Sequence, residues 1–417
     1  MTIISMLNKG SVNQRLDALK TLVYELSIHP KKKEMDVNNH VHTFYSFSPY
    51  SPTHAAYACY QAGLSVAGII DHDTVSGIKE FREAAKILKM VATAGTEVRV
   101  KFPVFDRIIN NPDQKGVMYM VAHGICDNHL DDFNTYLKPY RTYREIRNRK
   151  MVIKINQLLK AVMTINYDQD VRTLSLADEG GSVTERHILF ALAKTLLKHF
   201  DDMDQLIAFV QETFDVNVSE KQRRLLHDKT STFIAYDLLG VLKTNTSKYY
   251  IPASQELPDA KEFVAFAISH GAIPAYAYLG DVNESVTGDK RAQTFEDNYL
   301  EDLFIELKKI GVPAIAYMPT RNTLTQIERL QQLAKQYDMI EISGEDINSP
   351  RQQFNCDAYQ DPKYAHLIQS AWALVGHEAL YSHDPNRGLL GSYFKNLSIK
   401  NRIAYFSDFA KSLEVFK

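Results

Sequence analysis

The stretch VAGIIDHDT, residues 66–74, decides the fold, because an apolar run ends abruptly in three ionisable residues. A short apolar run of this kind predicts a buried strand. The charges that follow it need ionic partners or a metal ion to offset their loss of hydration. A second interpretation stays open beside this one, in which Asp73 or Thr74 caps a helix that begins near Gly77. Under both interpretations a strand ends at Asp71.

Six further segments repeat this form, a short apolar run that ends in polar or ionisable residues. They are residues 35–43, 90–100, 116–124, 272–281, 313–321 and 338–348. Helical stretches between several of them are predicted over residues 53–62, 77–90, 296–309 and 323–337. Alternating strands and helices imply right-handed crossovers and a parallel sheet. About seven such units can close into a barrel whose reactive residues lie at the carboxyl ends of the strands.

The remaining segments divide the chain into five predicted parts. Residues 13–27 read as one amphipathic helix, and the basic run Lys31–Lys33 reads as a solvated linker. The long gap between the strand-like runs is rich in Leu, Lys, Arg and Asp with helical periodicity, which predicts a helical insertion. The predicted parts are an N-terminal helix and linker (1–35), the first part of the barrel (36–130), the insertion (131–259), the second part of the barrel (260–350) and a C-terminal extension (351–417).

Composition excludes several classes of protein. The chain has 417 residues, and its 48 Lys and Arg against 50 Asp and Glu give a net charge of −2. This balance disfavours long nucleic acids and anionic lipid as partners. Three widely spaced cysteines form no disulfide framework, and no apolar run is long enough to span a membrane. Residues 1–10 lack the apolar core of a secretory signal, so we expect a cytoplasmic protein.

Side chains suited to metal binding follow the predicted strands. His40 and His42 are two apart in an extended run, so both imidazoles point to one face, although ordinary polar residues at a strand end fit the same pattern. Glu97 and Arg99 share a strand face, either as a metal ligand beside a phosphate-binding guanidinium or as a simple salt bridge. The other candidates at strand ends are His72, His123, Asp346 and Asn348. His377 and Glu378 follow an apolar run and could mark one more strand end.

Taken in order, these residues resemble the PHP family (polymerase and histidinol phosphatase domains), over roughly residues 36–350. His40-Val41-His42-Thr43 resembles the family's opening His-x-His-Thr, residues 71–74 its Asp-His-Asp-Thr, and Gly95-Thr96-Glu97 its Gly-x-Glu strand. Residues 184–188 resemble an Arg-Pro-His-Ile segment in the helical insertion of the nucleotide-phosphatase branch, and residues 344–348 resemble the closing Gly-Ser-Asp-Phe-His. The resemblance implies a distorted (β/α)7 barrel that carries a metal-dependent phosphoesterase site.

The resemblance also implies the ligand set and its departures. The implied metal ligands are His40, His42, His72, Glu97, His123 and Asp346. Tyr278 stands where the family has a metal-binding His, and Asn348 replaces the closing His. We therefore expect one or two divalent ions (Mn, Zn or Fe) in place of a cluster of three.

The function expected from this set is hydrolysis of a small phosphomonoester, a nucleotide or a short oligonucleotide by metal-activated water. The expected catalytic residues are His72, Asp73 and Arg99, with Asp73 orienting a ligand from behind. The expected substrate-binding residues are Arg99, Arg186, Arg321, Tyr278 and Asn348, with Arg351 nearby, although a single arginine more often forms a salt bridge. Residues 285–291 read as a loop that is either a lid or a linker.

Two other functions stay open. A degenerate domain of this type would bind a nucleotide or a protein without catalysis. A related barrel could hydrolyse an amide or a carboxylic ester with the same metal. The oligomeric state is not predicted.

Overall fold

The computed structural model describes residues 2–26, 36–160, 162–281 and 296–413. Within these residues the sheet has the strands β1 (Val37–Val41), β2 (Val66–His72), β3 (Val91–Lys101), β4 (Val117–His123), β5 (Ile273–Ala277), β6 (Ala314–Tyr317) and β7 (Ile340–Ser343). The helices between strands are α3 (Pro52–Gln61), α4 (Ile78–Ile87), α10 (Ala260–Ser269), α11 (Leu300–Lys309) and α12 (Leu324–Gln336). The predicted α/β fold with seven strand units is confirmed. The basic run 31–33 and the loop 285–291 lie outside the described residues.

The seven strands form one mixed sheet in chain order, β1 to β7. All neighbours are parallel except that β4 runs antiparallel to both β3 and β5. The prediction of an all-parallel sheet is therefore wrong for β4. Residues 102–116, which connect β3 to β4, contain no helix that could carry the chain back across the sheet, so the two strands pair as a hairpin.

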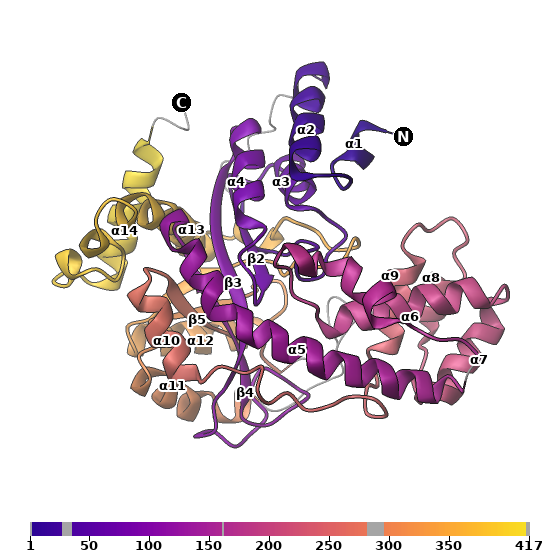
Figure 1. Cartoon of the computed structure of the whole chain (residues 1–417). Coiled ribbons are helices and arrows are strands. Elements are labelled where there is room, and N and C mark those ends of the chain that lie inside the picture. The colour runs from indigo at the N-terminus through magenta and orange to yellow at the C-terminus, as the bar shows by residue number, and fades with distance from the viewer. Residues whose placement is uncertain (1, 27–35, 161, 282–295, 414–417) are drawn as a thin grey trace.

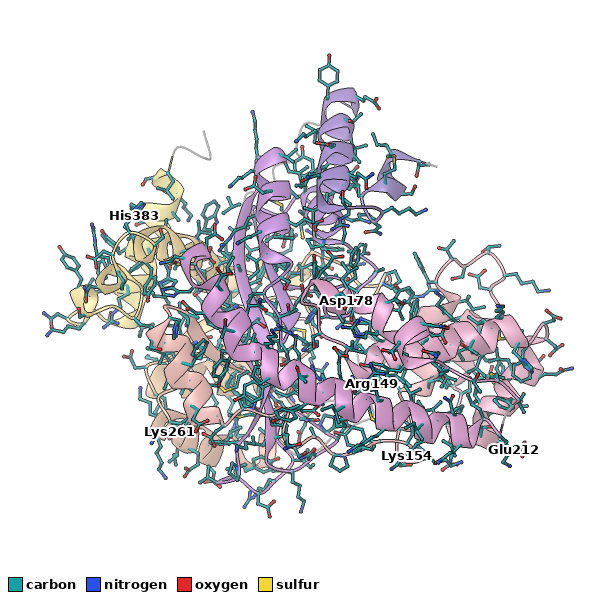
Figure 2. All side chains as sticks on the ribbon, viewed as in Figure 1. Arg149, Lys154, Asp178, Glu212, Lys261 and His383 are labelled. Carbon is teal, nitrogen blue, oxygen red and sulfur yellow. The ribbon has the colours of Figure 1, made fainter. Side chains whose placement is uncertain are left out.

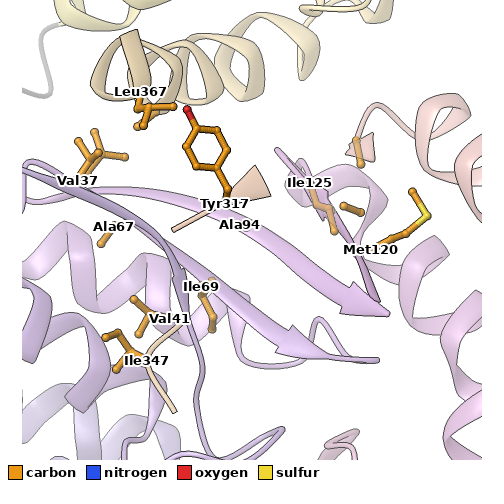
Figure 3. Close-up of a cluster of buried hydrophobic side chains, with 14 of the residues drawn as sticks. Val37, Val41, Ala67, Ile69, Ala94, Met120, Ile125, Tyr317, Ile347 and Leu367 are labelled. Carbon is orange, nitrogen blue, oxygen red and sulfur yellow. The ribbon is translucent and has the colours of Figure 1, made fainter. Parts of the chain in front are cut away.

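The sheet is a curled half-barrel whose first strand meets the segment that follows the last. Val41 and Ile347 form an isolated parallel bridge, in which His42 N donates to Ile347 O and Ile347 N donates to His40 O, both at 3.0 Å. Figure 3 shows Val41, Ile347 and Ile69 together under the strands. All three side chains are buried, because the apolar faces of the two edges pack against each other.

The predicted helical insertion contains α5 (Leu130–Leu158), α6 (Glu185–His199), α7 (Met203–Phe214), α8 (Glu220–Leu226) and α9 (Ile234–Leu242). Helix α5 runs from the sheet to the other four helices (Figure 1). Its first half packs in the core of the sheet through Leu130, Phe133 and Leu137, and its second half packs in a separate core of the insertion. Figure 2 shows Arg149 and Lys154 on α5 and Glu212 on α7 at the surface, so the exposed faces carry both signs of charge.

Helices flank the sheet at both ends of the chain. Before β1 lie α1 (Ile3–Met6) and α2 (Val12–Leu26), and after β7 lie α13 (Ala365–Tyr381) and α14 (Ile399–Ser412). His377 and Glu378 lie in α13, so the interpretation of this segment as a strand end is wrong. Twelve of its 17 residues are buried, which is why its apolar run resembles a buried strand in the sequence. None of the described helices combines the length and apolarity needed to cross a membrane. The five predicted domain boundaries stay predictions.

We predict that α14 stabilises the sheet through Phe406, which is fully buried in a cluster with Ile273, Ala314 and Ile340 of three strands. Phe406→Ala should lower the free energy of unfolding by about 3–5 kcal/mol through lost burial and the remaining cavity. The change is measured by urea denaturation. Tyr393→Ala, at a side chain that is 70% exposed, is the control and should change stability by less than about 0.5 kcal/mol. Equal effects of the two substitutions would contradict this role for Phe406.

Candidate metal centre

Three histidines at the carboxyl ends of β1 and β2 converge on Glu97, which lies in the middle of β3. Parallel pairing places His72 of β2 directly beside Glu97 of β3. Glu97 Oε2 lies 3.1 Å from His72 Nδ1, and the Nε2 atoms of His40 and His42 lie 3.6 and 3.8 Å from the same oxygen. The imidazole rings of His40 and His42 are 5.0 Å apart, as expected for residues two apart in an extended segment. One carboxylate oxygen therefore faces three imidazoles.

Asp346 completes this arrangement from the far end of the sheet. The bridge at Ile347 brings the carboxylate of Asp346 to the face of β1 that carries the histidines, where its Oδ1 lies 3.2 Å from His42 Nε2. Two groups thus have ligand atoms that all lie within 4.8 Å of one another, His40–His42–Asp346 and His42–His72–Glu97. The side chain of Asp346 is 35% exposed, so this edge of the group is open to solvent.

A hydrogen-bond relay fixes the orientation of His42. Asp71 accepts from Thr43 N at 2.7 Å, from Thr43 Oγ1 at 2.6 Å and from Ser46 Oγ at 2.6 Å. Since the single proton of Ser46 is used in this way, its oxygen accepts from His42 Nδ1 at 3.2 Å. A neutral His42 therefore carries its proton on Nδ1 and turns the lone pair of Nε2 toward Asp346 and Glu97.

This arrangement fits a cation. The Nε2 atoms of His40, His42 and His123 are buried and have no hydrogen-bond partner within the part of the chain that the structure describes. Burial lowers the pKa values of His72 and His123 to about 3, so both imidazoles are neutral and able to act as ligands. Burial would raise the pKa of Glu97, but the imidazoles led by that of His72 outweigh it and hold the pKa at about 2. Imidazole nitrogens beside carboxylates are the donor set of a divalent metal site.

His123 lies at the edge of this group. His123 pairs with Gly95 because β4 runs antiparallel to the second half of β3. His123 is therefore the last residue of a strand that runs in the direction opposite to β3. A pocket lined by His123, His40, Glu97 and Asp346 continues toward Tyr278. The Tyr278 hydroxyl donates to Asp297 Oδ1 at 2.5 Å, and Asp297 belongs to none of the candidate metal groups.

Asn348 supports Asp346. Its side-chain amide donates to Asp346 Oδ1 at 2.6 Å, and its carbonyl oxygen accepts from Arg186 Nη1 at 2.5 Å. Burial opposes ionisation of Asp346, but the side chains of His42, His40 and Arg186 nearby hold its pKa well below its usual value. The structure therefore places Asn348 and Arg186 behind a candidate ligand, on the side of the insertion.

Arg99 does not lie where a phosphate could reach it. Its two terminal amino groups pair with Glu185 at 2.9 Å and Glu256 at 2.6 Å, and the residue is 3% exposed. Arg147 pairs with the same two carboxylates. The prediction that Arg99 binds substrate is therefore not supported. The alternative, a salt bridge between Arg99 and Glu97, is not supported either, because Arg99 pairs with Glu185 of α6 and with Glu256, which follows the insertion helices.

Asp73 belongs to the same buried ionic cluster. Its carboxylate pairs with Arg144 of α5, and its carbonyl oxygen accepts from Arg141 at 2.9 Å. The role of Asp73 in orienting a metal ligand is therefore not supported. The capping interpretation is wrong as well. The N-cap of α4 is Gly77, which has no side chain, so neither Asp73 nor Thr74 caps this helix.

Two other predicted arginines also have protein partners. Arg321 Nε donates to Leu279 O at 2.9 Å, at the end of the pocket near Tyr278. Arg351 forms two bonds of 2.7 and 2.8 Å with the carboxylate of Asp237 on α9. Asp71 and Ser46, which position His42, are not among the site residues that the sequence predicts. Side chains alternate between the two faces of a strand, so the sequence does indicate that Asp71 points to the face opposite to His72.

We predict that the buried ionic cluster holds the insertion to the sheet. Glu256→Gln leaves Arg99 and Arg147 without one of their two carboxylate partners and should cost about 3–5 kcal/mol of unfolding free energy. The matched control is Asp168→Asn, which breaks the exposed pair with Arg149 and should change stability little. Urea denaturation of both variants measures the difference, and similar values would contradict the prediction.

We predict that the relay through Ser46 tunes metal affinity. Ser46→Ala removes the acceptor of His42 Nδ1 and should weaken divalent-metal binding by about 10–100-fold. The affinity is measured by competition with a chromogenic chelator. Ser382→Ala, at an exposed serine, should bind as the wild type does. An unchanged affinity in Ser46→Ala would show that the relay does not orient the ligand.

Comparison with known proteins places the fold. No family model and no curated protein matches the sequence. A solved structure described as a candidate metal-dependent phosphoesterase, from Bifidobacterium adolescentis, matches with a TM-score of 0.52 at 20% identity and covers 79% of this chain and 96% of its own. An amidohydrolase from Chromobacterium violaceum, solved with bound sulfate and no metal, matches with a TM-score of 0.51 at 16% identity and covers 76% of this chain and 89% of its own. The chain therefore has the fold of these phosphoesterase-like and amidohydrolase structures, as its resemblance to the PHP family predicts.

Proposed function

We propose that this chain is a metal-dependent hydrolase that cleaves a phosphate ester. One observation carries the proposal. His42 is held at Nδ1 by Ser46, and its Nε2 lies 3.8 and 3.2 Å from the carboxylates of Glu97 and Asp346, so a cation placed between these three groups would contact all of them. The nitrogen is buried and lacks any hydrogen-bond partner among the described residues. The donors present are those of a manganese, zinc or iron site.

The roles of the residues follow from their positions. His40, His42, Glu97 and Asp346 would hold the principal ion, and His72 and His123 would hold or flank a second. A bound divalent ion supplies Lewis acidity toward a phosphoryl oxygen and lowers the pKa of water. Glu97 Oε2 faces both His40 and His72, and this position is compatible with one bound ion or with two. Asp346 is exposed to solvent on one side, where a substrate would have room. Arg186 donates a hydrogen bond to Asn348, which lies next to Asp346.

Phosphate is favoured over an amide as the group that reacts. One structure with this fold is described as a phosphoesterase, and the amidohydrolase structure holds sulfate, a tetrahedral oxyanion like phosphate. Small phosphomonoesters, nucleotides and short oligonucleotides stay the proposed substrates, and a cytoplasmic location stays part of the proposal.

A non-catalytic binding role is the second candidate, and two observations favour it. Tyr278 is engaged with Asp297, and Asn348 with Asp346. At both positions where the family has a histidine, the side chain of this protein thus donates a hydrogen bond to a carboxylate.

The proposal is tested with the purified full chain, by elemental analysis and by a hydrolysis screen with added manganese, zinc or iron. The screen holds glycerol phosphate, nucleoside monophosphates, a dinucleotide and an N-acetyl amino acid. We expect a bound transition metal and ester hydrolysis that falls at least about 100-fold in Asp346→Asn, with reduced metal content. Asp361→Asn, an exposed substitution, is the control.

The other outcomes separate the candidates. Bound metal without turnover of any ester supports the non-catalytic role. Hydrolysis of the amide alone overturns the phosphate assignment. Full ester hydrolysis in Asp346→Asn overturns the proposed centre.

A further inference from the structure

Two histidines and one aspartate gather at the surface, outside the candidate metal centre. His129 lies at the start of α5, Asp132 in the first turn of the same helix, and His270 at the end of α10. One possible ligand atom from each residue lies within 4.8 Å of the other two, and the group shares no residue with the groups of the metal centre. Both histidines are half-buried and Asp132 is exposed, so an ion from solution can reach them.

His129 does not cap the helix that it begins. It is the N-cap residue of α5, a position that favours Ser, Thr, Asp and Asn because their short side chains accept from the first backbone N–H groups. Among the described residues, the side chain of His129 makes no such capping bond. Its Nδ1 lies 2.9 Å from Asp132 Oδ2 instead. An imidazole held at one nitrogen by a carboxylate is the arrangement that orients the histidine ligands of metals.

Hydrogen bonds also fix the ring of His270. Its Nδ1 lies 2.9 Å from Phe266 O and 3.0 Å from Ser269 Oγ, and since a carbonyl oxygen only accepts, this nitrogen carries a proton. In the neutral form of the ring, the lone pair is therefore on Nε2, which is the nitrogen left for a metal. The ring centroid of His270 lies 4.2 Å from that of Phe266 and 5.4 Å from that of His129. The ring thus packs against both neighbours.

Helix α13 holds the backbone next to His270. His377 Nε2 donates to Gly271 O at 2.6 Å, while His377 Nδ1 accepts from Leu389 N at 2.9 Å. Gly271 has a φ of 76°, and a Cβ at this position would collide with the ring of Tyr381. The end of α10 is therefore positioned by contacts that need no ion. A group that is positioned in advance loses less entropy when it binds an ion, which favours binding.

We propose that His129, Asp132 and His270 bind a zinc ion that is separate from the candidate metal centre. Imidazole nitrogen and carboxylate oxygen are ligands that zinc prefers, and water completes the coordination on the exposed side. The ion joins the start of α5, which carries the insertion, to the end of α10, which leads into β5. Its role is to stabilise the fold. The inference does not depend on the phosphoesterase proposal, because the two sites share no residue.

Zinc binding is tested on the purified full chain, which is stripped of metal and then titrated with zinc in competition with a chromogenic chelator. We expect His270→Ala to lose one class of zinc that the wild type binds. Asp132→Asn should weaken the same class by at least about 10-fold. The matched control is Asp131→Asn, which removes an exposed carboxylate from the same helical turn but from outside the group, and should bind zinc as the wild type does.

The variant Asp346→Asn separates this zinc from the metal centre. Zinc should raise the melting temperature of Asp346→Asn more than that of the double variant Asp346→Asn/His270→Ala, because an ion bound by the folded chain stabilises it. The inference is overturned if His270→Ala binds zinc as the wild type does, or if Asp131→Asn weakens binding as much as Asp132→Asn. If this class of zinc is present but the wild type hydrolyses no ester, the phosphoesterase proposal alone is overturned.

Discussion

The pairing of Ile347 with β1 is the constraint on which the candidate site depends. Asp346 and His42 are about three hundred positions apart in the sequence, and they meet because two backbone hydrogen bonds of 3.0 Å join Ile347 to His40 and His42. These bonds fix the strand-like register, so Asp346 turns toward the histidines, and Asn348, two residues on, lies beside it. Without that pairing the sheet would stay open at this edge, and the ligand set would lack one of its two carboxylates.

A second constraint is the buried exchange of charge between the sheet and the insertion. Arg99 of β3, with Arg144 and Arg147 of α5, faces Glu185, Glu256 and Asp73. Burial would raise the pKa of Glu185, but the arginines led by Arg99 hold it well below its usual value. Each of the three carboxylates lies against at least one guanidinium group, so these buried negative charges are all paired, which makes them tolerable in the interior. The cluster fixes the start of α6, and with it Arg186 and His187, beside the metal centre.

Two residues, Asn348 and Tyr278, stand where the resembled family has a histidine, and each donates a hydrogen bond to a carboxylate. The amide of Asn348 donates to Asp346 and accepts from Arg186, so it orients the neighbouring candidate ligand. Tyr278 binds Asp297 in the segment that follows β5. The candidate metal-binding atoms gather around His42 and Glu97.

The sequence by itself determined the α/β fold, the strand units and the group His40, His42, His72, Glu97 and Asp346. It could do so because apolar periodicity is local and because the carboxyl ends of parallel strands gather at one edge. Only the tertiary structure decided the reversal of β4, the helical state of His377 and Glu378, and the partners of Arg99, Asp73 and Tyr278. A buried charge pairs with whichever opposite charge the packed chain brings within reach, and in this protein those partners come from helices and return segments far away in the sequence.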